Sequence, residues 1–470
     1  MSIYPIPIVD LFAGPGGLGE GFSRVDGGKA FKIIVSIEKD RYAIETLRLR
    51  AFYRARVKSK KKLPKAFFDL LSAKNEKDKD QATDKLSELA EWKVAKKEAL
   101  HLELGKDNKK IYSHIRRRLC GKKNFVLIGG PPCQAYSLVG RSRMKNHEGN
   151  KKDHRHHLYK HYLAIINKFK PSVFVMENVK GINTAKVLGK RILPKILKDL
   201  SGKDKYKLHT ITSENNTSEK EPSYLVKSEK YGIPQTRHRV IIIGVRNDIC
   251  KKINSLKFSN EVTVQEAISD LPKLRGLNSS MTRSDYEVNF CGMPFRKIKK
   301  TSNLRKNLPN QLRKFVKPLS KDLYDCILNH EARSHMQEDL DRYEWWAKQA
   351  QGLKRSPTLN DRIPQRFLPK HKNISKNGTA SFADRFKVQV ADKPSGTITS
   401  HISKDGHYYI HYDPKQRRSF SVREAARVQT FPDDYFFRGN KTQQYHQVGN
   451  AVPPYLALQI AERVSKIVLK

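Results

Sequence analysis

A cysteine preceded by two prolines is the first residue whose surroundings favour chemistry over packing. It stands in Gly130-Pro131-Pro132-Cys133-Gln134, directly after an apolar run at 124–128. A thiolate is a strong nucleophile, and two prolines restrict the backbone that presents the sulfur. An isolated cysteine is more often inert packing, but this position at the end of an apolar run favours Cys133 as a nucleophile.

A carboxylate and two guanidinium groups flank further apolar runs. Glu177 follows the run at 172–176, and Arg237 and Arg239 stand in Gln235-Thr236-Arg237-His238-Arg239, where the run at 239–245 begins. A carboxyl group beside a thiol can protonate a ring nitrogen, and an arginine can bind a carbonyl oxygen. Each residue alone could belong to an ordinary ion pair. Together with Cys133 they predict one catalytic site.

A glycine-rich turn follows the first apolar run. Gly14, Gly16 and Gly19 match the pattern G-x-G-x-x-G, and Glu38 closes the second run 19 residues later. Glycines allow a tight turn and a close approach of the backbone to a ligand, and the acid can hold two ribose hydroxyls. Taken alone, the pattern predicts a nucleoside cofactor such as NAD, FAD or S-adenosylmethionine, with a purely structural turn as the alternative.

Short apolar runs alternate with amphipathic segments through the first half of the chain. The predicted strands are 6–12, 31–37, 124–128, 172–176 and 239–245, with a crossover helix over 159–169. Apolar runs of this length between helices are typical of a parallel sheet covered on both faces. The predicted fold class is α/β, with a doubly wound, mostly parallel sheet. Its carboxyl-end edge would collect the glycine-rich turn, Cys133 and Glu177.

Two stretches interrupt this alternation. Residues 51–119 are rich in lysine and predict a helical insert with solvated faces, with contact to a polyanion as the alternative. Residues 248–393 are basic and irregular, and predict a second, smaller domain that grips the substrate. Trp345 and Trp346 lie in a helix predicted over 334–351, where we interpret them as core packing. Residues 394–470 return to helical patterns, and the last helix begins at Val452-Pro453-Pro454 because proline fits a first turn.

Composition limits the classes of protein that remain. Among 470 residues there are 93 Lys and Arg against 47 Asp and Glu, a net charge of +46, which favours a polyanionic partner such as nucleic acid. Lysine-rich coding bias accounts for some of this charge. The five cysteines are scattered without a C-x-x-C pair, so neither a disulfide framework nor a zinc ribbon is indicated. With no apolar run near ~20 residues and no leader pattern, we expect a cytoplasmic protein without a membrane span.

Six motifs in a fixed order resemble those of the DNA (cytosine-5-)-methyltransferase family. They are DLFAGPGG at 10–17, GGPPCQ at 129–134, MENV at 176–179, QTRHR at 235–239, SVREAARVQTFPD at 421–433 and QVGNAVPP at 447–454. The resemblance covers 6–50, 124–246 and about 392–470. It implies the S-adenosylmethionine-dependent methyltransferase fold, a catalytic domain over 1–247 with the insert at 51–119, a target-recognition domain over 248–393, and a C-terminal segment at 394–470 that returns to the catalytic domain.

The resemblance also implies the residue roles. Cys133 would add to carbon 6 of a flipped-out cytosine, Glu177 would protonate or hold nitrogen 3, Arg239 would hold the carbonyl oxygen, and Arg237 would brace the site. The residues implied to bind S-adenosylmethionine are Phe12, Gly14, Gly16, Gly17, Leu18, Glu38, Pro131 and Asn450. The implied partner is double-stranded DNA, with a cognate restriction endonuclease acting separately in a prokaryotic host. We expect a monomer.

Three alternatives are less well supported. The tRNA-methylating branch of the family has a short substrate region with a Cys-Phe-Thr element, whereas more than 150 residues separate QTRHR from SVREAARVQ here and no such element occurs. A non-catalytic DNA-binding module would be expected to lack Cys133 or Glu177. A dehydrogenase fits the glycine-rich turn but not the PPCQ and GNAV motifs.

Two features fit the resemblance less simply. The family usually ends its third cofactor strand with an acid near the adenine amino group, and Glu103, inside the insert, is only a weak candidate. Asp153-His154-Arg155-His156-His157, together with His161, looks like a metal cluster. Relatives carry a similar Asp-x-Arg stretch before the crossover helix, so we predict no metal site there.

Overall fold

The computed structural model describes residues 5–132, 158–187, 189–202, 205–212, 223–278, 292–298, 304–368 and 385–469. Its central sheet has the strand order β3-β2-β1-β4-β5-β11-β8, and β9 pairs with β11. The strands are β1 (Ile6–Leu11), β2 (Phe31–Glu38), β3 (Ala99–His101), β4 (Val126–Gly129), β5 (Val173–Val179), β8 (Tyr206–His209), β9 (Leu225–Lys227) and β11 (His238–Arg246). Pairing from β3 to β5 is parallel, and β11 is antiparallel to its neighbours.

Both faces of the sheet are covered, which explains the fully apolar strands. Ile6 and Ile8 of β1 enter one core and Val9 and Leu11 the other. The first core contains α1 (Gly17–Phe22) and α16 (Pro454–Val468), which pack on each other. The second contains α6 (Asn108–Leu119), α8 (Leu158–Phe169) and α9 (Ile192–Ser201). The predicted α/β class with a mostly parallel sheet is confirmed.

The five predicted strands and the crossover helix are present within a few residues of their predicted bounds. The predicted insert at 51–119, however, contains a strand and a helix of the sheet layers. β3 pairs with β2 in parallel, Glu38 opposite His101, and α6 covers the sheet before β4. The helices that remain between α2 and β3 are α3 (Lys65–Ser72), α4 (Glu76–Ser87) and α5 (Ala90–Glu98).

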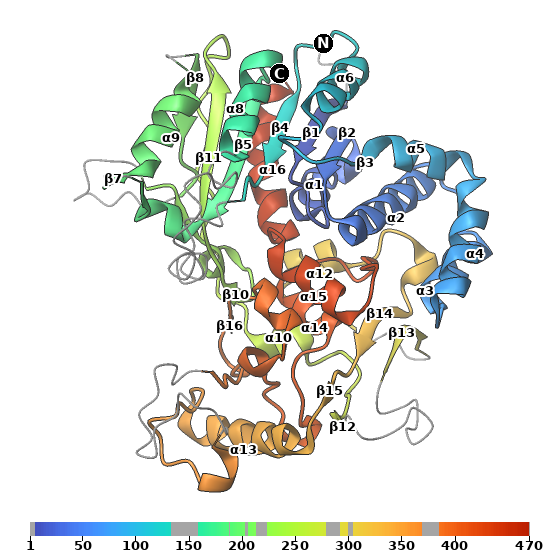
Figure 1. Cartoon of the computed structure of the whole chain (residues 1–470), viewed down its shortest axis with the longest axis vertical. Coiled ribbons are helices and arrows are strands. Elements are labelled where there is room, and N and C mark those ends of the chain that lie inside the picture. Colours follow the sequence, from blue (N-terminus) through green and yellow to red (C-terminus); the bar gives the residue numbers. More distant parts are fainter. Residues whose placement is uncertain are drawn as a thin grey trace.

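These three helices do not stand free in solvent. With α2 (Arg41–Lys58) they form an apolar core. This core also contains Leu323, together with Cys326 and Leu328 of β14 (Cys326–Glu331). The ring centre of Phe68 lies 6.0 Å from the ring centre of Phe295 in β13 (Gly292–Lys297). The insert therefore joins the sheet part of the molecule to the lower part seen in Figure 1.

The region after β11 has short strands and isolated helices. They are α10 (Val264–Ile268), β12 (Leu277–Asn278), β13 (Gly292–Lys297), α12 (Asn310–Val316), β14 (Cys326–Glu331), β15 (Ser334–His335) and α13 (Gln337–Leu353). Trp346 of α13 is fully buried beside Tyr343, and Trp345 stacks on Phe367, which confirms core packing for the tryptophan pair. Figure 1 shows α13 at the end of the molecule opposite the sheet, with α14 (Val422–Val428) and α15 (Lys441–Asn450) between them.

Short pairs complete the secondary structure: β6 (Lys186–Val187) with β7 (Lys190–Arg191), and β10 (Gln235–Thr236) with β16 (Ser395–Gly396). The last helix begins at Pro454, as its two prolines predict. Within the described ranges, no helix combines the length and apolar character that crossing a bilayer requires.

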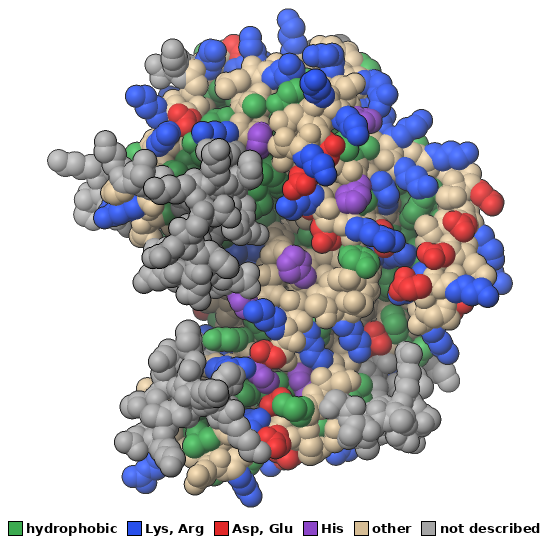
Figure 2. Space-filling view, viewed as in Figure 1, with side chains coloured by type: hydrophobic (Ala, Val, Ile, Leu, Met, Phe, Trp, Pro, Cys, Tyr) green, Lys and Arg blue, Asp and Glu red, His purple; other side chains and the backbone are tan. Residues whose placement is uncertain are grey.

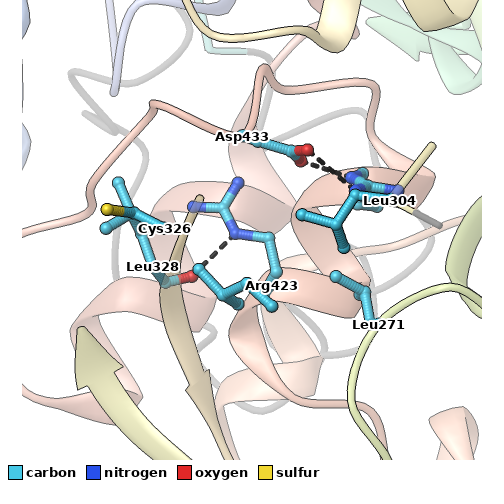
Figure 3. Close-up of a pocket in the computed structure, with 8 residues that line it drawn as sticks. Leu271, Leu304, Cys326, Leu328, Arg423 and Asp433 are labelled. Atoms are coloured by element: carbon cyan, nitrogen blue, oxygen red, sulfur yellow. Dashed lines mark hydrogen bonds and ion pairs between the residues drawn. The ribbon is translucent and has the colours of Figure 1, made fainter. Parts of the chain in front are cut away.

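A buried ionic cluster lies beneath α14, where the C-terminal segment meets the region after β11. Arg427 pairs with Asp433 and, at 3.2 Å, with Asp270, while Arg305 Nε lies 2.6 Å from Asp433. Figure 3 shows Asp433 and Arg423 at a narrow pocket that Leu271, Leu304, Cys326 and Leu328 help to line. Burial alone would raise the pKa of Asp433, but the guanidinium groups of Arg427 and Arg305 lower it to about 2.

Replacing Arg427 with methionine should therefore destabilise the fold strongly. The substitution leaves Asp270 without its ion pair and Asp433 with Arg305 alone, which costs about 3–5 kcal/mol of unfolding free energy. Urea denaturation measures the loss. The control is Lys348→Met, which removes an exposed pair with Glu344 and should cost about 1 kcal/mol or less. Equal, small losses in the two variants would show that the cluster does not hold the two regions together.

Candidate active site

The register of three strands brings Gly130, Glu177 and Arg239 to one place. β4 and β5 pair Gly129 with Met176, so Gly130 lies beside Glu177. A Cβ atom on Gly130 would lie 2.8 Å from Glu177 Oε2, so any larger residue there would displace this carboxylate. β11 pairs Arg239 with Val179, and Arg239 Nε lies 2.9 Å from Glu177 Oε1.

The Glu177–Arg239 pair remains accessible from one side. Each side chain is 13% exposed. Burial lowers the pKa of Arg239, and the carboxylate of Glu177 opposes that shift. Arg239 Nη1 also donates to the carbonyl of His238 at 2.8 Å. The pair thus presents an oriented carboxylate and an oriented guanidinium at the carboxyl-end edge of β5.

Asn178 connects the strand that carries Glu177 to the proline loop. Its Nδ2 donates to the carbonyl of Pro131 at 3.3 Å, and its Oδ1 accepts from the amide of Val179 at 2.8 Å. Cys133 is two residues beyond Pro131 in the sequence and lies outside the described residues. The stretch 153–157, with its histidines, also lies outside them. Among the residues that are described, no group of three or more His, Cys, Asp or Glu is arranged to hold a metal ion.

Arg237 is turned toward the C-terminal segment. It is 2% exposed, and its Nη1 donates to the carbonyl of Ile398 at 2.6 Å and to that of Gly449 at 3.3 Å. The neighbouring Gln235 accepts from the amide of Ile398 at 3.1 Å. Burial lowers the pKa of Arg237, and the adjacent charge of Arg239 adds to this shift. The QTRHR motif therefore holds two distant segments against β11 while it presents Arg239.

The glycine-rich turn is held in an unusual backbone conformation. Phe12, Gly14 and Gly16 have φ values of 55°, 54° and 96°. Glu38 Oε2 accepts from the amide of Gly14 at 2.8 Å, and its Oε1 accepts from the amides of Lys39 and Asp40. Since left-handed conformations cost free energy outside glycine, the turn depends on such contacts.

The glycines of the turn differ in what surrounds them. A Cβ atom on Gly14 would meet nothing within 4 Å, so this side of the turn is open. On Gly16 it would lie 2.9 Å from the hydroxyl of Tyr435, and on Gly17 it would lie 2.1 Å from the carbonyl oxygen of Val452. Gly14 thus borders free space, whereas Gly16 and Gly17 are required by packing. Leu18 points into the core and can offer a ligand only its backbone.

Asp10 and Tyr435 support this turn, and the sequence analysis assigned a role to neither. Asp10 is the last residue but one of β1, and its carboxylate is 1% exposed and has no hydrogen-bond partner among the described residues. Burial raises its pKa, and the charge of Glu38 adds to the effect. The hydroxyl of Tyr435 donates to the carbonyl of Pro15. An acid in an apolar strand immediately before the turn was the available signal for Asp10. None was available for Tyr435.

Asn450 and Glu103 lie near the same edge. Asn450 is exposed at the end of α15, with its Nδ2 3.2 Å from His446 Nε2, and Val452 two residues later contacts the turn. Glu103 follows β3, and its carboxylate lies 3.1 Å from Lys39 Nζ, next to Glu38. Phe12 is half-buried against the core that contains α8. Pro131 is buried beside Asn178.

Comparison with known proteins places this arrangement in a family. A family model described as C-5 cytosine-specific DNA methylase matches residues 6–74 and 106–466. The chain is 34% identical to "Type II methyltransferase M.Bpa9945I" of Bacillus paralicheniformis, over 98% of this chain and 99% of that protein. It is 27% identical to "DNA (cytosine-5-)-methyltransferase M.ApeKI" of Aeropyrum pernix, over 74% and 82%.

The fold has a counterpart among solved structures. A protein described as a DNA modification methyltransferase encoded within a prophage of E. coli superposes with a TM-score of 0.59 at 20% identity, over 99% of this chain and 100% of that one. At this identity the match concerns the fold alone. The family model does not cover 75–105, which contains α4, α5 and the sheet strand β3.

Proposed function

The chain belongs to the C-5 cytosine-specific DNA methylase family and is a DNA (cytosine-5-)-methyltransferase of restriction-modification type that uses S-adenosylmethionine. From this premise we propose that it methylates a cytosine flipped out of a specific duplex site, through a covalent adduct with Cys133. The observation that carries the proposal is the ion pair of Glu177 and Arg239, set against the backbone that leads to Cys133.

The chemistry requires the groups that meet at this edge. Carbon 5 of cytosine is a poor nucleophile. Addition of the Cys133 thiolate to carbon 6, with a proton supplied to nitrogen 3 by Glu177, gives an enamine. Carbon 5 of this enamine can attack the sulfonium methyl group of S-adenosylmethionine, with S-adenosylhomocysteine as the leaving group. Arg239 would hold the carbonyl oxygen and keep Glu177 oriented, and Arg237 would brace the strand. A base then removes the proton from carbon 5, the carbon–sulfur bond breaks, and the thiolate is released.

The residues around the glycine-rich turn fit S-adenosylmethionine, which supplies an electrophilic methyl group. The open side of Gly14 offers space for a ligand, and Glu38 lies where it can accept hydrogen bonds from ribose hydroxyls. Phe12 would lie against the adenine ring. Gly16, Gly17 and Leu18 would shape the backbone near the methionine end, and Pro131 and Asn450 would border it.

The DNA partner follows from the same geometry. Glu177 and Arg239 are mostly buried, so a cytosine stacked within a duplex cannot reach them and has to leave the stack. We propose that residues 248–393 read the target sequence, that 1–247 and 394–470 form the catalytic domain, and that α3–α5 fasten the two. A prokaryotic host, a cytoplasmic monomer and a separately acting restriction endonuclease complete the proposal.

Replacing Cys133 with serine should abolish methyl transfer while cofactor binding persists, because an alcohol is far less ionised than a thiol near neutral pH. DNA that carries 5-fluorocytosine at the target should trap the wild-type enzyme, since fluorine cannot leave as a proton does. Mass spectrometry of the trapped complex should find the adduct on Cys133. An adduct on another cysteine, or active enzyme that is never trapped, would contradict the assignment.

Replacing Gly14 with alanine tests the cofactor turn. Its Cβ would enter the open space, so the affinity for S-adenosylmethionine in calorimetry should fall at least tenfold. Gly27→Ala is the matched control, because Gly27 has a φ of +58° against +54° for Gly14 and equally free surroundings. Both variants bear the same backbone strain. Equal affinity in the two would mean that the turn is only structural. Gly16→Val is less informative, since its side chain would clash with Leu47.

Exchanging residues 248–393 for the matching segment of a relative with another target should move the methylated motif to that of the relative. Base discrimination comes from a few side chains, each worth about 1–3 kcal/mol. Methylome sequencing in a host without cytosine methylation of its own measures the outcome. An active chimera that keeps the original motif would overturn the domain division.

A further inference from the structure

Positive charge is distributed unevenly over the lysine-rich part of the chain. Residues 76–97, which include most of α4 and α5, contain six Lys against six Asp and Glu. Residues 106–124, which include α6 and the turn after it, contain eight Lys and Arg against one Asp. A general lysine bias of the coding sequence would not produce this contrast between neighbouring helices. The excess of positive charge belongs to one surface.

That surface is formed by the outer side of α6 and the segments beside it. α6 turns Ile111, Ile115 and Leu119 into the core and leaves its other side exposed. We define the α6 patch by the exposed cations at the ends of α6 and α8 and just beyond them, which are Arg116, Arg117, Lys122, Lys123, Lys168 and Lys170. Figure 2 shows Lys and Arg side chains gathered over the end of the molecule where Figure 1 places α6.

Contacts between the segments make the patch continuous. Lys168 Nζ at the end of α8 lies 5.1 Å from the ring centre of Tyr112 in α6. Arg246 Nη1 donates to the carbonyl of Lys170 at 2.6 Å and to that of Lys123 at 3.4 Å. The turn after α6, the end of α8 and the end of β11 therefore meet.

Few carboxylates neutralise these cations. Asp248, beside the patch, pairs with Arg246. Over the described ranges, the structure gives no ion pair to Arg116, Arg117, Lys122 or Lys123. Cations in the last turns of α6 and α8 also offset the helix dipoles, but that effect ends within one turn and does not account for Lys122 or Lys123.

The α6 patch lies at the edge of the sheet opposite the active site. α6 and α8 lead into the first residues of β4 and β5, and the antiparallel β11 ends beside them. Gly130, Glu177 and Arg239 stand at the other end of the same strands. A cytosine held at Glu177 therefore belongs to a different stretch of DNA from any phosphate bound at the patch.

We propose that the α6 patch is a second DNA-binding surface, which holds the phosphates of duplex DNA outside the recognised site. This second contact with DNA is separate from the methyl transfer reaction. Clustered cations release counterions from duplex DNA, which gives a sequence-independent and salt-sensitive attraction. This contact would keep the enzyme on DNA between target sites without altering the methylated sequence.

The test compares two variants that each lose four positive charges. The patch variant carries Arg116→Gln, Arg117→Gln, Lys122→Gln and Lys123→Gln. The control variant carries Lys77→Gln, Lys85→Gln, Lys93→Gln and Lys96→Gln, all exposed positions of α4 and α5. Binding to a long duplex with one target and to a duplex just long enough for the target is measured over a range of salt concentrations, with thermal unfolding as the folding check.

For the long duplex, the slope of log affinity against log salt should fall by about three in the patch variant, at about 0.9 per lost phosphate contact, and by less than one in the control. Binding to the short duplex and kcat should stay within about twofold. Equal slopes in the two variants would overturn the proposal, as would an equal loss on the short duplex. The proposal would also be overturned if the patch variant lost binding to anionic lipid vesicles while its salt slope for DNA stayed unchanged. Wild-type methylation of the short duplex tests the proposed function separately.

Discussion

The close contact between Gly130 and Glu177 is the constraint on which the rest of the site depends. Two parallel strands end side by side, and a methyl group on Gly130 would push the Glu177 carboxylate out of its place. This contact fixes the distance between the carboxylate and the loop that continues to Cys133. Because β11 runs antiparallel on the other side of β5, Arg239 reaches the same carboxylate from a third strand. The position of the site is thus set by strand register.

The C-terminal segment provides support from the opposite end of the chain. Gly449 accepts from Arg237, Val452 lies against Gly17, and Tyr435 donates to the carbonyl of Pro15. These residues support the glycine-rich turn without taking part in the reaction. They fill the space around a turn with three left-handed residues, and so make one conformation of that turn better packed than any other.

The sequence predicted the strands well because fully apolar runs have few other uses in a polar chain. It missed β3, whose three residues lie among lysine-rich helices without an apolar run of their own. It also treated α3–α5 as a solvated excursion, because helical periodicity shows that one face is apolar but not what covers it. The cover comes from Leu323 and Leu328, more than 200 residues away.

The candidate site shows the same contrast between residues that can be identified by their type and residues that only the fold identifies. Motif residues such as Glu177 and Glu38 could be named because their chemistry is evident from their type and from their place after a strand. Asp10 offered only the signal of an acid in an apolar strand, and Tyr435 offered none, because its role depends on the carbonyl of Pro15 that its hydroxyl meets. Arg237 and Arg239 are two residues apart in one motif, yet one contacts the C-terminal segment and the other Glu177. Alternation along one strand would place both side chains on the same face, but Arg237 lies in the break between β10 and β11, whereas Arg239 lies within β11.

The apolar core shared by α3–α5 and β14 has a mechanical consequence. Separating the two parts of the molecule on that side would expose Phe67, Trp92 and Leu328 to water together. Any widening that admits a duplex therefore has to begin on the far side and pivot about the insert. The side of the molecule that α3–α5 occupy is therefore the hinge side of such an opening.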